Sequence, residues 1–290
     1  MHRDTAAKSN MIAEKYLFWR AIRPFSFSVA LIVCLTGIVI AYRDGITNIP
    51  LSLLILSAGL LLQTGVNLIN DYADLSQPEL SPASIRQIKA NFNYGLISFL
   101  LAAIIGFFLI INSGPLLLVL TAIGVVGALG YTLEPINYKR RGLAVLLVFW
   151  LMGVLMVVGS YYALSSEITA DLFLLSVPVS LFTSLLLLSN EIRDFEDDCA
   201  NGINTLTVRL GYPTAVVLYR SLVVSVYLAC LLLYLFNLLP GALWVLLSLP
   251  VLLLPLGRLE KTGADRSRLP PETGRSFLCF GLCYCLALLF

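Results

Sequence analysis

The sequence predicts an all-α protein: a polytopic membrane bundle of about nine transmembrane helices with a polar cap on the cytoplasmic side. Two observations support this prediction. Of the 290 residues, 59% are hydrophobic and only 12% are charged, whereas ordinary soluble domains carry about a quarter charged residues. Apolar runs of membrane-spanning length also recur along the chain, and a transmembrane β-barrel would instead show shorter segments of alternating polarity.

The apolar runs give the predicted helices in order. Most have the length that a helix needs to cross the hydrocarbon core, and the last is short. A basic stretch before the last span, Leu256–Arg275, is interpreted as a connector. The predicted spans are Phe25–Tyr42, Leu51–Ile69, Gly95–Ile111, Leu116–Tyr131, Gly142–Leu164, Leu172–Ser189, Thr214–Phe236, Leu243–Gly257 and Phe277–Phe290.

The polar residues before the first span are predicted to lie at the membrane surface. Met11–Pro24 combines aromatic and basic side chains, among them Trp19 and Lys15, which is typical of an interfacial helix. No apolar core with a small-residue cleavage site is visible there, so we expect no cleavable signal. We therefore divide the chain into a cytoplasmic, interfacial segment, 1–22, and a membrane domain, 23–290.

The basic residues predict the orientation of the chain. With a cytoplasmic N-terminus, the loops after even-numbered spans are cytoplasmic, and these loops and the N-terminal tail hold nearly all Lys and Arg residues, with Arg43 on the other side. The positive-inside rule then predicts a multi-pass protein of the cell membrane whose polar cap faces the cytoplasm. A net charge of only +2 argues against a nucleic-acid partner, and nothing in the sequence indicates the oligomeric state.

Two acidic clusters interrupt the apolar pattern at matching places. The first follows the second span and the second follows the sixth. In each cluster Asn and Asp recur every four residues, which puts their side chains on one helix face. Carboxylates near hydrocarbon are costly, so these residues are candidates for function. The two stripes are Asn70 and Asp74, and Asn190, Asp194 and Asp198.

Opposed stripes of carboxylate and amide oxygens at the mouth of an apolar interior indicate a Mg²⁺ site for a diphosphate substrate. Mg²⁺ usually binds one or two carboxylates plus substrate phosphates, and two such ions would make diphosphate a better leaving group. Nearby Lys and Arg side chains would bind the remaining anionic oxygens. The apolar interior would hold a hydrocarbon chain and keep water from a carbocation. The implied substrate is an allylic prenyl diphosphate.

Several motifs, in order along nearly the whole chain, resemble the UbiA superfamily of intramembrane prenyltransferases, and most of all its menaquinone-pathway 1,4-dihydroxy-2-naphthoate prenyltransferase-like branch. Asn70–Asp74 is similar to the first half of the family's first aspartate-rich motif. Asn190–Asp198, followed by Thr205–Gly211, closely resembles the second motif and its tail. Tyr138–Gly142 resembles the segment that links helices 4 and 5, and Arg23-Pro24 matches the usual entry to helix 1.

The first motif departs from the family pattern. Where the family has a further Asp, this chain has Pro78 and Leu80, and Glu79 is the nearest acid. Ala144-Val145 also stands where the menaquinone branch has Gly-Glu. The second metal site is therefore expected to be complete and the first reduced, and the identity of the acceptor stays open.

The acidic spacing and the resemblance together imply the roles of individual residues. Asp71 could also pair with Lys89 or Arg86, and Arg193 could brace Asp197 or Glu196. Asp71 is the least poor candidate for a general base. The expected ligands of Mg²⁺ are Asn70, Asp74, Asn190, Asp194 and Asp198. The expected diphosphate-binding residues are Lys139, Arg140 and Arg193, and the expected catalytic acids are Asp71, Asp74, Asp194 and Asp198.

The resemblance implies a membrane prenyltransferase that moves a prenyl group from its diphosphate to an aromatic or quinone-precursor acceptor. Its partners would be the prenyl diphosphate, a small aromatic acceptor and membrane lipid. Two alternatives stay open: a terpene cyclase of the same superfamily, which needs no acceptor, and a non-catalytic protein that binds or transports prenyl diphosphate. The sequence determines neither the prenyl chain length nor the choice between Mg²⁺ and Mn²⁺.

Overall fold

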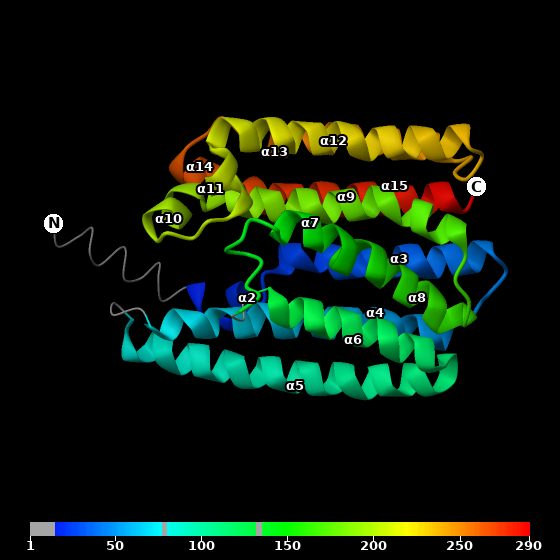
Figure 1. Ribbon diagram of the computed structural model, residues 1–290, viewed down its shortest axis with the longest axis horizontal. Helices are drawn as coiled ribbons and strands as arrows, with labels where there is room; N and C mark the ends of the chain where they lie inside the picture. Colours follow the sequence, from blue (N-terminus) through cyan, green and yellow to red (C-terminus); the bar gives the residue numbers. More distant parts are fainter. Residues whose placement is uncertain (1–14, 77–79, 132–134) are drawn as a thin grey trace.

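The computed structural model describes residues 15–76, 80–131 and 135–290. Its long helices run side by side along one axis, and the described residues contain no strand (Figure 1). The all-α membrane prediction is confirmed. Among the described residues, seven helices are long and apolar enough to cross a membrane, and shorter apolar helices occupy the other two predicted positions, Pro115–Gly130 and Ala242–Leu256. The total of nine spans therefore stays a prediction.

The N-terminal half of the bundle is built from helices with clear start signals. Asn48 accepts a hydrogen bond from the Leu51 amide at 3.1 Å and caps α4, and Ser81 caps α5 through the Ser84 amide. Gly114, with a φ of 102°, separates α5 from α6. The elements are α2 (Phe18–Ala21), the 3₁₀-helix η1 (Pro24–Ser26), α3 (Phe27–Arg43), α4 (Ile49–Asn70), the 3₁₀-helix η2 (Asp71–Ser76), α5 (Pro82–Ser113) and α6 (Pro115–Gly130).

The C-terminal half begins with a helix that is interrupted by a π-helical turn, η3, a feature often found near functional sites. The elements are α7 (Ala144–Val148), η3 (Phe149–Val154), α8 (Leu155–Ser165), α9 (Ala170–Arg193), α10 (Phe195–Ala200), α11 (Leu206–Leu210), α12 (Tyr212–Leu235), the 3₁₀-helix η4 (Ala242–Ser248), α13 (Leu249–Leu256), α14 (Gly263–Arg266) and α15 (Leu269–Leu288).

The last helix begins earlier than the sequence predicts. α15 starts at Leu269 inside the expected connector Leu256–Arg275, because Pro270 suits the first turn of a helix. Glu272 lies in that turn, where a negative charge is favourable, and its carboxylate binds Arg258 at 3.0 Å. The polar first turn is thus held against the end of the bundle, and the connector shrinks to residues 257–268.

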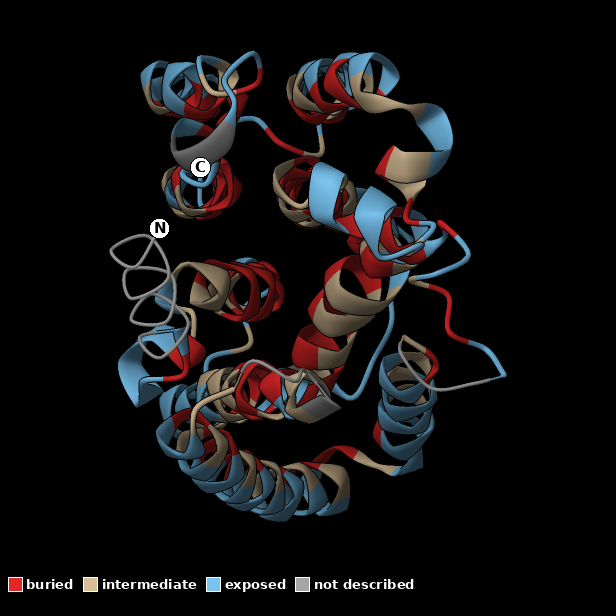
Figure 2. Cartoon of the chain, turned by 90° about the vertical axis from the view of Figure 1, so that its left-hand side faces the viewer, coloured by how far each residue is buried: buried red, intermediate tan, exposed pale blue. Residues whose placement is uncertain are grey.

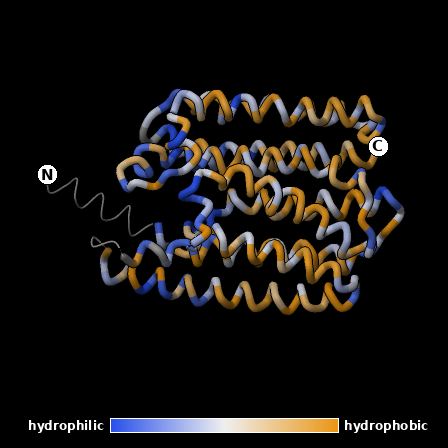
Figure 3. Tube along the Cα trace, in the orientation of Figure 1, coloured by the Kyte–Doolittle hydropathy of each residue, from blue (hydrophilic) through white to orange (hydrophobic). Residues whose placement is uncertain are grey.

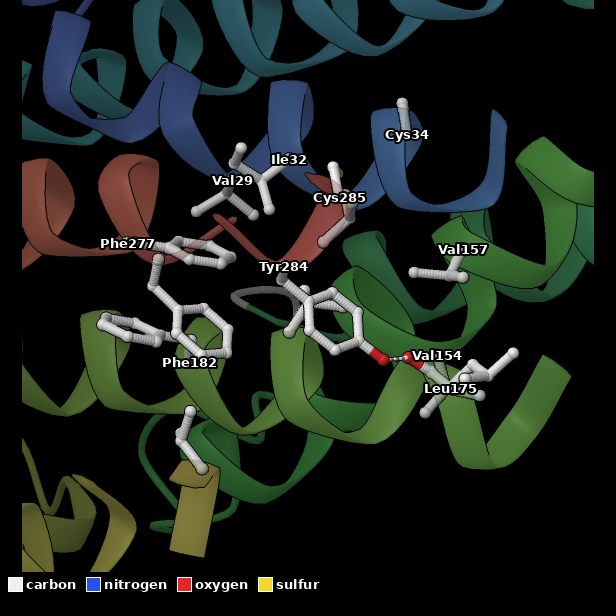
Figure 4. Packing of buried hydrophobic residues seen from close by; sticks show 14 of the residues in the cluster. Val29, Ile32, Cys34, Val154, Val157, Leu175, Phe182, Phe277, Tyr284 and Cys285 are labelled. Atoms are coloured by element: carbon white, nitrogen blue, oxygen red, sulfur yellow. Dashed lines mark hydrogen bonds between the residues drawn. The ribbon is translucent and has the colours of Figure 1, made fainter. Parts of the chain in front are cut away.

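The core lies between α3, α9 and α15, which are the most buried long helices. The Phe182 ring of α9 stacks on Phe277 of α15 with centroids 4.9 Å apart. The Tyr284 hydroxyl donates a hydrogen bond to the Leu175 carbonyl at 2.7 Å (Figure 4). Viewed from the polar end, buried residues face inward and the outer helices α5 and α12 present exposed apolar faces (Figure 2). Such faces are expected to contact lipid.

The described part of the expected interfacial helix, Met11–Pro24, is not one helix, and its residues 11–14 lie outside the described chain. Lys15 is helical, Tyr16 and Leu17 are not, and α2 then covers Phe18–Ala21. Arg23 has a φ of 48°, and a residue that precedes proline is disfavoured in the right-handed helix. Asn91 instead binds the Tyr16 carbonyl and Asn67 binds the Ile22 carbonyl, so side chains of α4 and α5 hold this segment across their ends.

Candidate active site

Both acidic clusters lie at the same end of the bundle. The first is formed by the end of α4 and by η2, and the second by the end of α9 and by α10. Figure 1 places α2, α10, α11 and α14 at this end, and Figure 3 shows that hydrophilic residues gather there. The turn 135–142 and the connector 257–268 complete this polar end. The expected site residues are therefore brought to one face of the protein.

The first cluster is bound by residues of the N-terminal segment. Asp71 is 1% exposed, and its Oδ1 accepts a hydrogen bond from Arg23 Nη2 at 2.6 Å. Its partner is thus Arg23 and not Lys89 or Arg86, the expected alternatives. Asp74 Oδ2 accepts from Lys15 Nζ at 2.6 Å and from the Tyr16 hydroxyl at 3.1 Å. Within the described chain, Asp71 Oδ2 is buried and has no hydrogen-bond partner.

Asn67, which the sequence interpretation missed, is a buried amide residue four positions before Asp71. Asn67 is 4% exposed and its side chain donates to the Ile22 carbonyl at 2.6 Å and to Ser26 Oγ at 2.7 Å. Asn70, the expected ligand, is exposed. Counting four residues back from Asp71, instead of from Asp74, would have selected Asn67.

The second cluster bends at Asp194, where α9 ends and α10 begins. Arg193 donates two hydrogen bonds to the Asp194 carboxylate, at 2.6 and 2.7 Å, so its partner is neither of the two expected acids, Asp197 and Glu196. Asp198 is 7% exposed and accepts from Thr205 Oγ1 at 3.3 Å. Asn190 donates to the Leu186 carbonyl at 3.1 Å.

A second missed residue, Glu191, lies within this cluster. It is 5% exposed, and its Oε2 accepts a hydrogen bond from the Thr207 amide at 3.2 Å. Its Oε1 is buried without a partner among the described residues. The four-residue spacing favoured Asn190, Asp194 and Asp198, and it therefore passed over the acid between them.

The basic residues expected to bind diphosphate differ in their surroundings. Lys139 is half-buried and interacts electrostatically with Asp198 and Glu191. Arg140 is exposed, and its carbonyl accepts from Arg209 Nη2 at 3.2 Å. Arg193 is occupied by the bidentate pair with Asp194. Of the three, Lys139 is thus the one that interacts with the buried acids.

Burial and neighbouring charges set the electrostatics of the site. Burial raises the pKa of the Asp71 carboxyl, and the Arg23 and Lys15 charges act in the opposite direction. Burial also raises the pKa of Asp198, and Lys139 opposes that shift. The pKa of Tyr131 is raised first by burial and then by the charges of Glu191 and Asp198, whereas Arg23 lowers it. Tyr131 is therefore within electrostatic reach of two acids of the second cluster and of Arg23, the partner of Asp71.

The residues present fit a hard divalent cation that is shared with a phosphate substrate. The available donors are carboxylate and amide oxygens, and one Asp71 oxygen is buried without a partner in the described chain. Among the described residues no three acids, His or Cys side chains converge on one point. Each ion would thus take only one or two protein carboxylates and leave other positions to substrate, as Mg²⁺ prefers. Glu79, the expected replacement acid, lies outside the described residues.

Residues 30–272 match the UbiA prenyltransferase family. The chain is 31% identical over 240 residues to 1,4-dihydroxy-2-naphthoate octaprenyltransferase of Haemophilus influenzae, covering 76% of this chain and 77% of that protein. It is 28% identical over 280 residues to UbiA prenyltransferase domain-containing protein 1 of Homo sapiens, covering 91% of this chain and 80% of that protein.

A solved structure also has the same fold. This is a UbiA homolog from Archaeoglobus fulgidus bound to GPP and Mg²⁺, with a TM-score of 0.61 over 93% of this chain and 99% of the other. The two sequences are only 12% identical, so the likeness concerns the arrangement of the helices.

Proposed function

Because the chain belongs to the UbiA prenyltransferase family and is thus a membrane prenyltransferase, we propose that it transfers a prenyl group from an allylic prenyl diphosphate to a hydroxylated aromatic acceptor. The proposed reaction depends on Mg²⁺. The acceptor class is a naphthoate-type quinone precursor, which the names of similar proteins support.

One observation carries the proposal: two clusters of acids lie at one polar end, and the first contains a buried carboxyl oxygen without a partner in the described chain, Asp71 Oδ2. Buried polar atoms are nearly always paired in folded proteins. The oxygens of both clusters suit a cation, and Lys139 and Arg193 supply positive charge beside Asp198 and Asp194 of the second cluster. In a diphosphate bound through metal ions, the metal ions would pair with the acids and the phosphate oxygens would pair with the Lys and Arg side chains.

We assign the metal to the two clusters, with the sequence-derived set Asn70, Asp74, Asn190, Asp194 and Asp198 as its starting point. Asp71, a buried acid with a spare oxygen, joins the first cluster, and Asn67 is a better placed amide than the exposed Asn70. Mg²⁺ would supply charge neutralisation at the leaving diphosphate. Lys139, Arg140 and Arg193 would bind the remaining diphosphate oxygens, with Arg193 exchanging its Asp194 pair for phosphate.

The chain's own residues would then favour ionisation of the allylic carbon–oxygen bond. Diphosphate leaves with the bonding electron pair, the acceptor's ring carbon attacks the allylic cation, and loss of the ring proton restores aromaticity. Tyr131 lies within electrostatic reach of Glu191, Asp198 and Arg23, and its ring could face the allylic cation. The ring proton passes to solvent or to the released diphosphate, because Oδ1 of Asp71, the expected base, is held by Arg23 and its Oδ2 is assigned to the metal.

The orientation of the protein is part of the proposal. The basic residues lie mostly in loops that share an end with both acidic clusters, so that end is assigned to the cytoplasm of a cell-membrane protein. Lys15 and Tyr16 bind Asp74 from the interfacial segment, 1–22. The segment and the membrane domain, 23–290, would therefore act as one unit.

The test uses purified protein in lipid with geranylgeranyl diphosphate and Mg²⁺, with and without 1,4-dihydroxy-2-naphthoate. Diphosphate release and the prenylated product are both measured. We expect release that depends on acceptor and is lost in Asp194→Asn. Asp197→Asn, which changes an exposed acid of the same segment, is the matched control and should retain activity. Release without acceptor would indicate a terpene cyclase, and binding without release would indicate a non-catalytic protein.

A further inference from the structure

Glu191 is a buried acid that the proposed metal and diphosphate sites do not use. It lies at the end of α9, and on an ideal helix Asn190, Glu191 and Asp194 fall within an arc of about 100°. Glu191 therefore points to the same side of the helix as the proposed ligands. Its residue exposure is only 5%, so its carboxyl group is removed from bulk water.

The two carboxyl oxygens of Glu191 have different surroundings. Oε2 accepts a hydrogen bond from the Thr207 amide at 3.2 Å, and the Thr207 hydroxyl donates to the Glu191 carbonyl at 3.3 Å. These two bonds fix the end of α9 against the start of α11. Oε1 has no donor within the described part of the chain. A buried hydrogen-bond acceptor without a donor is unfavourable, so a donor from another molecule would satisfy Glu191 Oε1.

The neighbours of Glu191 indicate what kind of molecule supplies that donor. Lys139 and Asp198 both interact with Glu191 electrostatically, and the charge of Glu191 acts on Tyr131. Glu191 thus borders both the charged site and an aromatic ring. A diphosphate oxygen is anionic and would be repelled by a carboxylate. Glu191 forms no trio with Asp194 and Asp198 among the described residues, and its Oε2 is already held by the Thr207 amide.

We propose that Glu191 Oε1 accepts a hydrogen bond from a hydroxyl group of the aromatic acceptor, and that this contact selects hydroxylated rings. The inference rests on the proposed transferase function and deepens it by assigning a residue to the second substrate. A ring hydroxyl is a neutral donor that can approach a carboxylate closely. The bond also holds the ring beside the charged site, where its carbon must meet the allylic carbon.

Substituting Glu191 by Gln should give a defined orientation of the new amide group, because the Thr207 amide holds one of the two polar atoms at the tip of the side chain. The Thr207 amide needs an oxygen, so the introduced glutamine would turn its amide oxygen toward Thr207 and its NH₂ group toward the acceptor. The site would then offer a donor in place of an acceptor. Ring hydroxyls should bind less tightly, and methoxy groups, which only accept, should bind more tightly.

The experiment measures steady-state transfer and competitive inhibition by two matched aromatic ligands, 1,4-dihydroxy-2-naphthoate and its O-methyl ethers. In wild-type protein the hydroxylated ligand should bind about 10- to 100-fold more tightly than the ethers, as expected for a hydrogen bond to a charged group. In Glu191→Gln this preference should be lost, with the KM for prenyl diphosphate and the Mg²⁺ requirement unchanged. Asp197→Asn, an exposed acid nearby, is the control and should keep the wild-type preference.

Three results would overturn the inference while leaving the transferase function intact. These are an unchanged ligand preference in Glu191→Gln, an equal loss of prenyl diphosphate or Mg²⁺ binding, and a wild-type protein that does not distinguish the hydroxylated ligand from its ethers. The last result needs no variant, so it decides the matter even if Glu191→Gln fails to fold. If wild-type protein prenylates no hydroxylated ring at all, both the inference and the proposed function fail.

Discussion

The two acidic clusters contain similar residues, but different parts of the chain brace them. In the first cluster, Arg23 and Lys15 lie 48 and 59 residues away in sequence from the acids they bind. In the second, Arg193 is adjacent to Asp194, and Thr205 is seven residues from Asp198. Asp194 and Asp198 are therefore hydrogen-bonded within one local segment, while Glu196 at the edge of this cluster pairs with Arg266 of α14. The first cluster depends on how the N-terminal segment docks across α4 and α5.

This difference indicates which of the two acidic clusters is fixed in place before substrate binds. A local brace forms with the helix that carries the acids. A brace from a distant segment forms only when that segment is in place, and its cations must then share the acids with metal.

The largest effect is expected at the second cluster. Asp198→Asn should lower kcat/KM about 100-fold or more, because partners that merely orient a metal ligand already contribute about 10- to 100-fold. Asp74→Asn should cost less, about 10-fold, since buried Asp71 with its spare oxygen remains in the first cluster. Transfer assays of both variants at saturating Mg²⁺ test this order. A larger loss in Asp74→Asn would reverse the comparison.

Breaking the brace of the first cluster should reduce stability. Arg23→Met leaves the Asp71 charge buried, and we expect a loss of about 1–3 kcal/mol, below the ~3–5 of a fully buried pair because Arg23 is 36% exposed. Denaturation in detergent micelles measures it. Arg23→Lys, which keeps the charge, is the control.

The same variant has a pH dependence with a definite sign. Burial raises the pKa of Asp71 and Arg23 opposes this shift, so the pKa should rise further in Arg23→Met. A raised pKa in the folded state means that stability is greatest at low pH and is lost as pH rises through that pKa. The deficit of Arg23→Met should therefore be largest near neutral pH and shrink on acidification. Adding Asp71→Asn should abolish this dependence, and a deficit that grows on acidification would refute the explanation.

A smaller effect is expected from the local brace of the second cluster. Thr205→Val removes the hydroxyl that donates to Asp198 at 3.3 Å, and the half-saturating Mg²⁺ concentration should rise about 10-fold. Thr205→Ser keeps the hydroxyl and should behave as the wild type. If the two variants shift the Mg²⁺ requirement equally, the hydroxyl does not brace Asp198.

The smallest effect is expected at Lys15. Lys15→Met removes a cation from Asp74, so the half-saturating Mg²⁺ concentration should fall about 2- to 5-fold, in line with the ~0.2–1 kcal/mol of an exposed ion pair. Lys15→Arg serves as the control. A Mg²⁺ requirement that rises in Lys15→Met would show that Lys15 assists the metal or the substrate instead of competing with them.

Most of the fold could be predicted from the sequence because apolar runs report directly on membrane-spanning helices. Their ends were less accurate. α5 begins at Pro82, well before the apolar run at Gly95, because Ser81 and Pro82 start a helix on capping and not on hydrophobicity. The expected interfacial helix Met11–Pro24 is longer than α2, Phe18–Ala21, and Asn67 and Asn91 of other helices bind the chain on either side of α2.

The candidate site was predicted in part. Spacing selected Asp74, Asp194 and Asp198, which all lie at the polar end. It could not reveal that Arg23 binds Asp71, because the two are far apart in sequence. It also could not distinguish Glu191 from the exposed acids nearby, because burial by Thr207 and α11 is a tertiary property.

The lengths of two neighbouring helices have a consequence for the lipid around the protein. α6 has 16 residues and α5 has 32, so α6 is about 24 Å long, shorter than the ~30 Å of a typical hydrocarbon core. α6 is exposed along nearly its whole length. For α6 to serve as one of the nine predicted spans, the bilayer would have to thin beside it, and this hydrophobic mismatch costs a fraction of a kcal/mol per Å. The thickness of the membrane therefore acts on α6, and α6 precedes the turn that carries Lys139.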